Sequence, residues 1–374
     1  MTVPFRACSR CCFASVATGS GARLGTTTSR SFSSSRTRLS SPPADPKAIT
    51  EAFLSKFSKG QTFVRHQLLD ANQIRLFSLT LNRPHLWPTS STKTLEEAEP
   101  VEGTPIPPAY HICYFTPAQL PGILGLDGTD ASFNPDAPFT RRMWAGGSCH
   151  WPGADPSSKN QALLVVGDTV TEVTKVLSCE PKVIGKTGES MLLVGVEKEF
   201  RNGKDELCVL DRRNWVFRVA LDPSKPAPLV PKPKELSQGE LDKSVEGKLW
   251  REYSRDEATL FRFSALTFNA HRIHYDKPWA TDVEGHRNVV VHGPMNLLAM
   301  LDLWRDEASV VRGQGIHYPQ MIEYRATSPV YGREPYRVMM NQEAVGKKEA
   351  ETRVVSNDGT VCMKGTVRDW PSSN

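Results

Sequence analysis

The sequence predicts an α+β protein made of two halves, each with an antiparallel sheet that wraps a central helix. Three strand-like runs precede a proline-rich stretch, at least three follow it, and each set comes after a stretch with helical character. In the second half Leu297, Leu298, Leu301 and Trp304 recur at helical spacing. Five prolines within 222–234 favour a stiff, extended connector. Two unrelated α+β domains are the alternative, because no strong residue-level repeat links the halves.

Turn-forming residues bound the predicted strands. They lie at 185–188 and 202–204 in the first half, and at Gly332 and 357–359 in the second. Pro294 opens the predicted helix Met295–Arg305, in a first turn where its missing N–H costs nothing. The strands are expected at Thr169–Ser178, Ser190–Arg201, Glu206–Arg218, Met321–Tyr331, Tyr336–Ala344, Ala350–Val355 and Val361–Trp370.

Residues 1–41 have the composition of a mitochondrial transit peptide. They contain six Arg, sixteen Ser or Thr and no acidic residue. The segment Arg30-Ser31-Phe32 resembles a matrix-peptidase recognition pattern, so we expect import into the mitochondrial matrix. A disordered serine-rich tail is the alternative.

The rest of the chain divides at the composition changes. We expect an N-terminal half over 42–221, degenerate in its chemistry, a proline-rich linker over 222–246 and a C-terminal half over 247–374. The polar stretch Pro84–Pro108 is interpreted as a long loop. These boundaries place the predicted helix Met295–Arg305 in the C-terminal half.

Charge, hydropathy and cysteine content exclude several classes of protein. The formal net charge of +5 comes from residues 1–41, and the remainder carries −1, so no nucleic-acid partner is expected. Apolar runs such as Ala162–Val166 are far shorter than the roughly 20 residues that cross a bilayer, so no membrane span is expected. The five cysteines after residue 41 form no CxxC pair, which predicts free thiols.

Four of the nine histidines fall within 22 residues, at His271, His274, His286 and His292. A metal site could use His271, His274 and Asp276, but no supporting motif such as HExxH is present, and no metal is predicted. A structural role for these rings also stays open. The third interpretation is acid–base chemistry, because imidazole takes up and returns a proton near neutral pH.

The residues around these histidines fit the addition of water to an activated double bond. Asn269 lies five residues before His274, where its amide could hold a water molecule. Gly293 follows His292 directly before the predicted helix, whose first N–H groups favour developing negative charge. A base, a water-positioning amide and an N–H pocket are the groups that hydration of an α,β-unsaturated carbonyl requires.

The stretch Phe261–Asp276, taken with Val290–Pro294, resembles the MaoC-like, type 2 enoyl-thioester hydratase/dehydratase family. The residues of this motif are most similar to those of the branch that contains fungal mitochondrial 3-hydroxyacyl-thioester dehydratases and bacterial mesaconyl-C4-CoA hydratases. Arg141–Gly147 resembles a matching block in the N-terminal half of these proteins, and the resemblance spans most of 50–370. It implies a double hot-dog fold and reversible syn addition of water to a trans-2-enoyl thioester, which gives the (R)-3-hydroxyacyl product. It implies no cofactor, and an acyl group carried by coenzyme A or acyl carrier protein.

The resemblance also implies roles for individual residues. The family's motif histidine falls on His274, which we expect to be the general base. The family's catalytic Asp falls on Asn269, an amide that cannot accept a proton and is expected to orient the water. Gly293 would donate its backbone N–H to the thioester carbonyl. The expected supporting residues are His271, Asp276 and His292.

Four further residues are candidates for binding the substrate: Arg272, Tyr275, Arg141 and Arg142. Arg272 could bind a carboxylate or phosphate, and Arg141 with Arg142 could face the phosphates of coenzyme A. Ordinary ion pairs are the alternative for all three arginines. Asp276 could serve only as a turn or capping residue, and Trp144 is expected in the core.

The leading hypothesis is dehydration of (R)-3-hydroxyacyl thioesters in mitochondrial fatty acid synthesis. A rival is hydration of a dicarboxylic acyl-CoA such as mesaconyl-C4-CoA, with Arg272 as the cation for the free carboxylate. A hot-dog thioesterase is disfavoured because His292 and Pro294, rather than a carboxylate, flank Gly293. Asn269 leaves a non-catalytic acyl-binding module open. No counterpart of His274 is seen in the first half, so one site per chain and a possible homodimer are expected.

Overall fold

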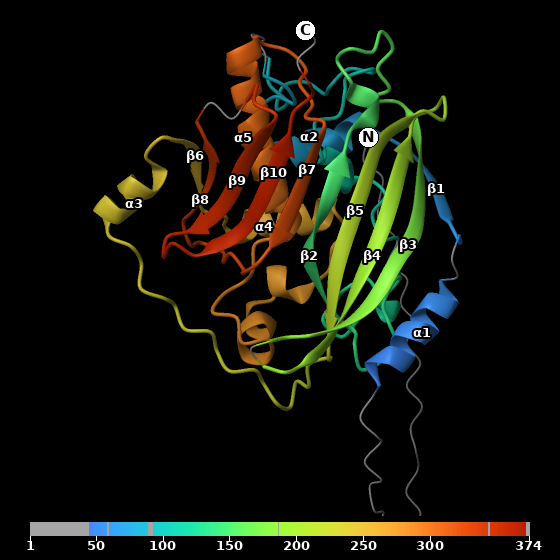
Figure 1. Cartoon of the computed structure of the whole chain (residues 1–374), viewed down its shortest axis with the longest axis vertical. Helices are drawn as coiled ribbons and strands as arrows, with labels where there is room; N and C mark the ends of the chain where they lie inside the picture. The colour runs from blue at the N-terminus through green and yellow to red at the C-terminus, as the bar shows by residue number, and fades with distance from the viewer. Residues whose placement is uncertain (1–44, 58–59, 89–92, 186, 343–344, 372–374) are drawn as a thin grey trace, which may run out of the picture. The chain divides into compact units, whose positions relative to one another are not determined.

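The computed structural model describes residues 45–57, 60–88, 93–185, 187–342 and 345–371. The predicted transit peptide lies outside the described residues. The described part contains one antiparallel sheet of ten strands, in the spatial order β1-β3-β4-β5-β2-β7-β10-β9-β8-β6 (Figure 1). No described helix is long and apolar enough to span a membrane.

The sheet consists of two sets of five strands with the same internal order. In each set the first strand is followed in space by the third, fourth, fifth and second, and β2 pairs with β7 to join the sets. This repeated order is the double hot-dog fold that the sequence predicts. The first set is β1 (Phe63–Leu68), β2 (Arg141–His150), β3 (Thr169–Val183), β4 (Ser190–Arg201) and β5 (Leu207–Arg218). The second set is β6 (Lys248–Tyr253), β7 (Met321–Ala326), β8 (Tyr336–Asn341), β9 (Glu349–Ser356) and β10 (Val361–Arg368).

One long helix, α5 (Gly293–Arg312), packs on the inner face of the second set, against β6, β8, β9 and β10 (Figure 1). Its apolar side chains are buried, Leu298 and Met300 among them. Gly365 on β10 lets the helix approach closely, because a Cβ there would lie 2.6 Å from Met300 Cε. The predicted helix is confirmed and extends further at both ends.

The first half carries shorter helices in the corresponding interval. Between β1 and β2 the described residues form α2 (Ala71–Thr80), two short 3-10 turns and long loops. α2 contacts α4 (Glu257–Leu266) of the second half, and α1 (Pro46–Lys56) covers part of β3 and β4. The inner face of the first half is therefore not covered by a helix as long as α5.

The joint between the halves depends on Gly146 and Gly147 of β2. A Cβ on Gly147 would overlap the carbonyl oxygen of Arg212 on β5, and one on Gly146 would overlap that of Tyr324 on β7. Two adjacent glycines weaken a strand in isolation. The sequence therefore did not indicate a strand here, although β2 lies at the centre of the sheet.

The predicted strands are all present, and β4 matches its prediction at both ends. β3 continues to Val183 instead of ending at Ser178, and β7 ends at Ala326 instead of Tyr331. The strands β1, β2 and β6 and the helices α1, α2 and α4 were not predicted. The predicted linker contains one helix, α3 (Gln238–Val245), after an extended stretch. That stretch is anchored, since Ala227 N–H donates to Val283 O and Val230 N–H to Gly285 O. The described cysteines are buried free thiols, as predicted.

Candidate active site

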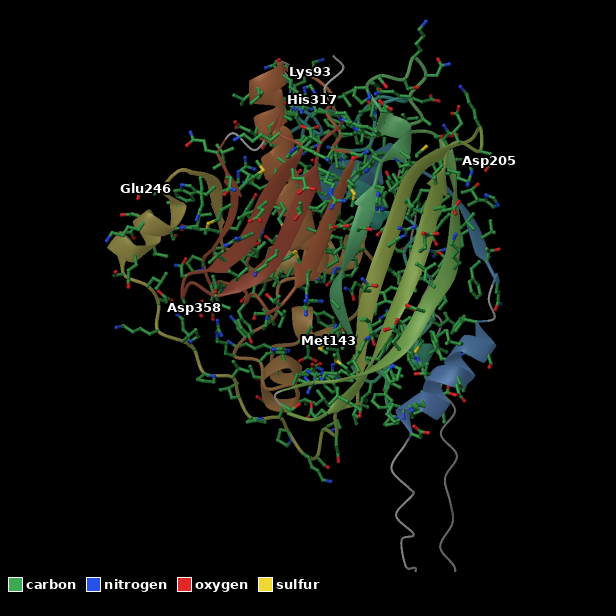
Figure 2. The ribbon with its side chains drawn as sticks, viewed as in Figure 1. Lys93, Met143, Asp205, Glu246, His317 and Asp358 are labelled. Carbon is green, nitrogen blue, oxygen red and sulfur yellow. The ribbon has the colours of Figure 1, made fainter. Side chains whose placement is uncertain are left out.

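A cavity of about 980 Å³ lies on the inner face of the sheet and is lined by residues of both halves. In the second half it is lined by residues at the end of α4, in the segment 267–291 and at the start of α5. From the first half it is lined by side chains of β1 to β5. Met143 of β2 lines it too, toward the end of the sheet opposite the Asp205 turn (Figure 2).

His274 ends the 3-10 turn Arg272–His274 and is buried in the wall of this cavity. Its Nδ1 lies 2.7 Å from the carbonyl oxygen of Val290, while Val290 N–H donates to Ile273 O at 2.8 Å. Because a carbonyl only accepts, Nδ1 carries the proton and Nε2 keeps its lone pair. Burial and the neighbouring His271 lower the pKa of His274 to about 3. The ring is therefore a neutral base at physiological pH.

His292 fixes the position of that ring. It caps α5 and stacks on His274 with the ring centroids 3.6 Å apart and the planes 20° from parallel. Its Nε2 lies 2.9 Å from Ser264 Oγ. Complete burial lowers the pKa of His292 well below its ordinary value, so two neutral rings face each other. Protonation of either ring would be resisted by the same burial.

Asn269 and His271 form a turn beside the base. Asn269 Oδ1 accepts from the His271 backbone N–H at 3.1 Å, which leaves the Asn269 Nδ2 group for a ligand in the cavity. The His271 ring meets His274 edge-on, with centroids 5.4 Å apart. Its Nε2 lies 3.8 Å from Asp127 Oδ2 and 3.7 Å from Glu284 Oε1, longer than direct hydrogen bonds.

Glu284 is a buried carboxylate that the sequence analysis missed. It accepts from Arg141 at 2.7 Å and from Trp279 Nε1 at 2.8 Å. Burial alone would raise its pKa, but contacts with His271, Arg141 and Trp279 outweigh burial and lower the pKa to about 2. No motif marks this residue in the sequence. Trp279 begins the helical turn Trp279–Val283 that Glu284 follows, but Arg141 comes from β2, and only the fold brings it to this carboxylate.

The candidate substrate-binding arginines all contact carboxylates of the protein. Arg141 pairs with Glu284, and Arg142 pairs with Asp130 at 3.1 Å while lying over the Trp215 ring. Both line the cavity. Their side chains are therefore held by internal ion pairs, and a role toward coenzyme A phosphates stays a prediction.

Arg272 is held in the same way. It pairs with Asp276 at 2.7 Å and lies over Trp279 with its Cζ 4.0 Å from the ring centroid. Asp276 also accepts from the Trp279 backbone N–H at 3.1 Å, which is the capping role that the sequence left open. Tyr275 is half-exposed, and its hydroxyl donates to Ala270 O at 3.0 Å.

Gly293 lies where an N–H pocket is expected. It is the first residue of α5 and lines the cavity, and the first N–H groups of a helix have no acceptor within it. A Cβ on Gly293 would lie 3.4 Å from Trp144 Cδ1. Trp144, which the sequence placed in the core, packs against the core and also lines the cavity.

Comparison with known proteins identifies the family. Residues 109–332 match the family described as hydroxyacyl-thioester dehydratase type 2. The chain belongs to this family. A mesaconyl-C(4)-CoA hydratase of Chloroflexus aurantiacus is 30% identical over 284 residues, which cover 74% of this chain and 89% of the relative. A mitochondrial hydroxyacyl-thioester dehydratase type 2 of Schizosaccharomyces pombe is 26% identical over 258 residues, 64% of this chain and 79% of the relative.

The fold is similar to that of solved MaoC-like proteins. A solved MaoC-like dehydratase of Phytophthora capsici superimposes with a TM-score of 0.52 at 15% identity, over 83% of this chain and 96% of that chain. At this identity the likeness concerns the fold alone. The family match and the two named relatives identify the chain as a hydro-lyase.

Proposed function

We propose that this dehydratase family member catalyses the reversible hydration of trans-2-enoyl thioesters, with His274 as the general base. The observation that carries the proposal is the bond from His274 Nδ1–H to Val290 O, which leaves a neutral Nε2 in a cavity shared with Gly293. A neutral imidazole accepts a proton from water and can return it to carbon.

In the hydration direction His274 Nε2 takes one proton from the water, whose oxygen forms a bond to C3 of the enoyl group. The C2–C3 π electrons move toward the carbonyl, and the Gly293 N–H stabilises the enolate oxygen. Protonated His274 then gives the proton to C2 on the same face, and the thioester stays intact. Dehydration is the reverse. Asn269 Nδ2 donates to the water oxygen, because Asn269 Oδ1 is occupied by the His271 N–H.

Two classes of acyl group are candidates for the substrate. Fatty acid synthesis in the mitochondrial matrix is supported by the composition of residues 1–41 and by the mitochondrial relative from S. pombe. A dicarboxylic acyl-CoA is supported by the mesaconyl-C(4)-CoA hydratase relative and by charged side chains in the cavity wall. The proposed carrier is coenzyme A or acyl carrier protein, in the mitochondrial matrix.

The test follows the loss of enoyl-thioester ultraviolet absorbance with crotonyl-CoA, trans-2-decenoyl-CoA and mesaconyl-C4-CoA. His274→Gln keeps a polar side chain but cannot accept a proton, and we expect kcat to fall by about 10²–10⁴-fold. Asn269→Ala is expected to lower kcat by a smaller factor. His66→Ala, an exposed histidine on β1, is the matched control. Wild-type rates in His274→Gln would overturn the proposal.

A further inference from the structure

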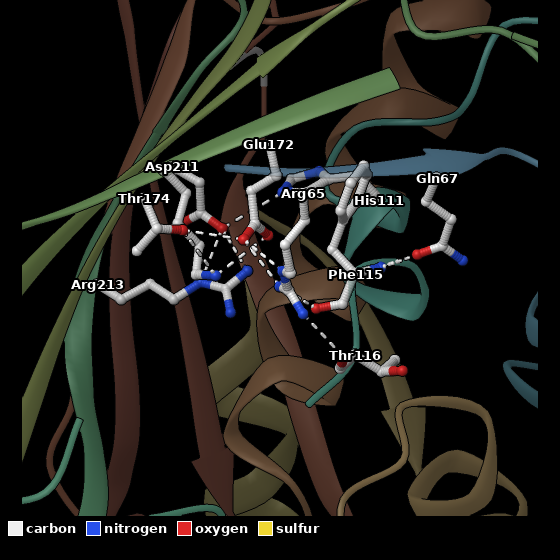
Figure 3. Close-up of polar contacts among 10 residues, drawn as sticks. Arg65, Gln67, His111, Phe115, Thr116, Glu172, Thr174, Asp211 and Arg213 are labelled. Atoms are coloured by element: carbon white, nitrogen blue, oxygen red, sulfur yellow. Dashed lines mark hydrogen bonds and ion pairs between the residues drawn. The ribbon is translucent and has the colours of Figure 1, made fainter. Parts of the chain in front are cut away.

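The inner face of the first half carries a row of charged side chains across its strands (Figure 3). The charged row consists of Arg65, Glu172, Lys198, Asp211 and Arg213. Arg65 on β1 is opposite Glu172 on β3, and Lys198 on β4 is opposite Asp211 on β5. Alternating apolar residues predict the strands β3 to β5, but no motif in the sequence marks these charged residues.

The row interrupts an apolar surface. On β4 the same face presents Val194 and Val196 before Lys198, and Phe200 after it. The valines belong to one buried cluster and Phe200 belongs to the other. On β5 the buried residues Val209 and Trp215 flank Asp211 and Arg213 in the same way, and they belong to the same two clusters. The charges thus occupy the middle of the inner face, between two hydrophobic cores.

Ion pairs connect the row. Glu172 contacts Arg65 at 2.8 Å and Lys198 at 3.1 Å, and Asp211 contacts Arg213 at 2.6 Å. The Glu172 side chain is 2% exposed and the Lys198 side chain is 9% exposed. Figure 3 shows the side chains of Arg65, Glu172, Asp211 and Arg213 converging from neighbouring strands, together with the ring of His111.

The row contains three cations and two carboxylates, but the Arg65 side chain is 39% exposed, so the buried members Glu172, Lys198, Asp211 and Arg213 carry no net charge. His111, which lies 3.3 Å from Asp211, adds none at neutral pH, because burial lowers its pKa below the ordinary 6.5. Burial also lowers the pKa of Lys198 to about 8, against the attraction of Glu172. A buried charge is costly unless a counter-ion and hydrogen bonds accompany it.

Arg65, Glu172, Lys198 and Arg213 line the same cavity as His274. Trp144 connects the two regions. Its Cδ1 lies 3.4 Å from the position of a Cβ on Gly293, and Arg213 Cζ lies 5.5 Å from the centroid of its ring. Trp144 Nε1 is buried and has no acceptor in the described part of the chain. The Trp144 indole ring therefore lies between the proposed thioester carbonyl site and Arg213.

A hydrocarbon chain placed against this wall would remove water from the charges and return no hydrogen bond. A carboxylate would accept charge-assisted hydrogen bonds from an ammonium or guanidinium. Resting on the function proposed above, we propose that the charged row binds a carboxylate at the distal end of a short acyl group. The substrate is then a dicarboxylic enoyl thioester, and Lys198 with Arg213 recognises its free carboxylate. Arg272, the cation expected from the sequence, pairs with Asp276 and is not among the residues that line the cavity, whereas Lys198 and Arg213 line it.

The first test compares fumaryl-CoA with crotonyl-CoA, which differ only by a carboxylate in place of a methyl group. Wild type is expected to show a kcat/KM for fumaryl-CoA at least about tenfold higher, and Lys198→Met to reduce that ratio by about 10- to 100-fold, as for loss of a hydrogen bond to a charged group. Lys175→Met is the matched control, because Lys175 lies on neighbouring β3 and pairs with Glu197 on the opposite face. Its ratio should equal that of wild type.

Lys198→Met leaves Glu172 without its ammonium partner, so the double variant Lys198→Met/Glu172→Gln is the second test. It removes both charges, keeps the net charge of the row, and is expected to show the same loss of preference. A wild-type preference for crotonyl-CoA, or an unchanged ratio in a folded Lys198 variant, would overturn the proposal.

Binding of saturated analogues separates this proposal from the proposed reaction. Succinyl-CoA and butyryl-CoA cannot be hydrated, and calorimetry should find succinyl-CoA bound at least about tenfold more tightly. His274→Gln should retain that preference, and Lys198→Met should lose it. Equal affinities in wild type would reject the carboxylate site even if hydration is observed. A retained preference without any hydration would reject the proposed function alone.

Discussion

The two halves of the sheet share one strand order but differ in what their inner faces contact. In the second half α5 fills the curve of the sheet, and the facing residues, such as Val338, Met340 and Val354, are apolar and buried. In the first half the same region bears the charged row and borders the cavity. The second half thus holds the long helix and the proposed base, while the half without a long helix holds the charged row that we propose to contact the acyl group.

The largest effect is expected from a substitution on β2, where the two halves of the sheet join. Gly147→Ala would place a Cβ onto the Arg212 carbonyl oxygen, which is backbone in the centre of the sheet and cannot move aside. We expect loss of at least about 4 kcal/mol of folding free energy, or no soluble protein. Urea unfolding measures it. Gly122→Ala, where a Cβ meets nothing within 4 Å, is the control, and equal stability of the two variants would contradict a close joint.

The next largest effect is expected when the buried His274 of the second half is replaced, and the buried His111 of the first half serves as the comparison. His274→Gln should lower kcat for the preferred enoyl-CoA by about 10²–10⁴-fold, because it removes the proton acceptor. His111 is equally buried but hydrogen-bonded to Asp211, so His111→Gln should lower kcat by a much smaller factor. Steady-state kinetics on both folded variants decides. If His111→Gln were the more damaging change, the chemistry would belong to the first half.

Lowering the pH should reduce the free energy of unfolding, because titratable groups of the candidate site in the second half have lowered pKa values. The pKa of His274 falls from the ordinary 6.5 to about 3 on folding, so between these values the unfolded chain binds more protons and stability declines as pH falls. Glu284, lowered from 4.5 to about 2, adds the same trend below pH 4.5. Urea midpoints at pH 7.5, 6 and 5 should decrease in wild type. His274→Gln should lose less stability over this range, and an identical decline would refute the assignment.

The smallest effect distinguishes the two candidate carboxylate-binding cations. Arg272 and Asp276 form a partly exposed pair, so Arg272→Met should reduce the free energy of unfolding by about 1 kcal/mol or less. The ratio of fumaryl-CoA to crotonyl-CoA activity should stay as in wild type, in contrast to Lys198→Met. Loss of the preference in Arg272→Met would move carboxylate recognition to the second half.

The sequence predicted the features that depend on local patterns of residues. Alternating apolar residues predicted β3 to β5 and β7 to β10, and helical spacing predicted α5. The motif around His274 indicated the base and its neighbours on one contiguous segment. The short strand β1 and the glycine-containing β2 were not predicted, because their formation depends on pairing with β3, β5 and β7.

By itself the sequence determined the family, the repeated α+β architecture and the segment that carries the proposed base. Only the tertiary structure decided which partners the charged groups have. It places Glu284 against Arg141 of β2, and it gathers Arg65, Glu172, Lys198 and Arg213 from four strands on one face of the sheet. Periodicity and motifs report interactions between near neighbours in the chain. Ion pairs across a sheet depend on strand order and register, which the whole fold sets.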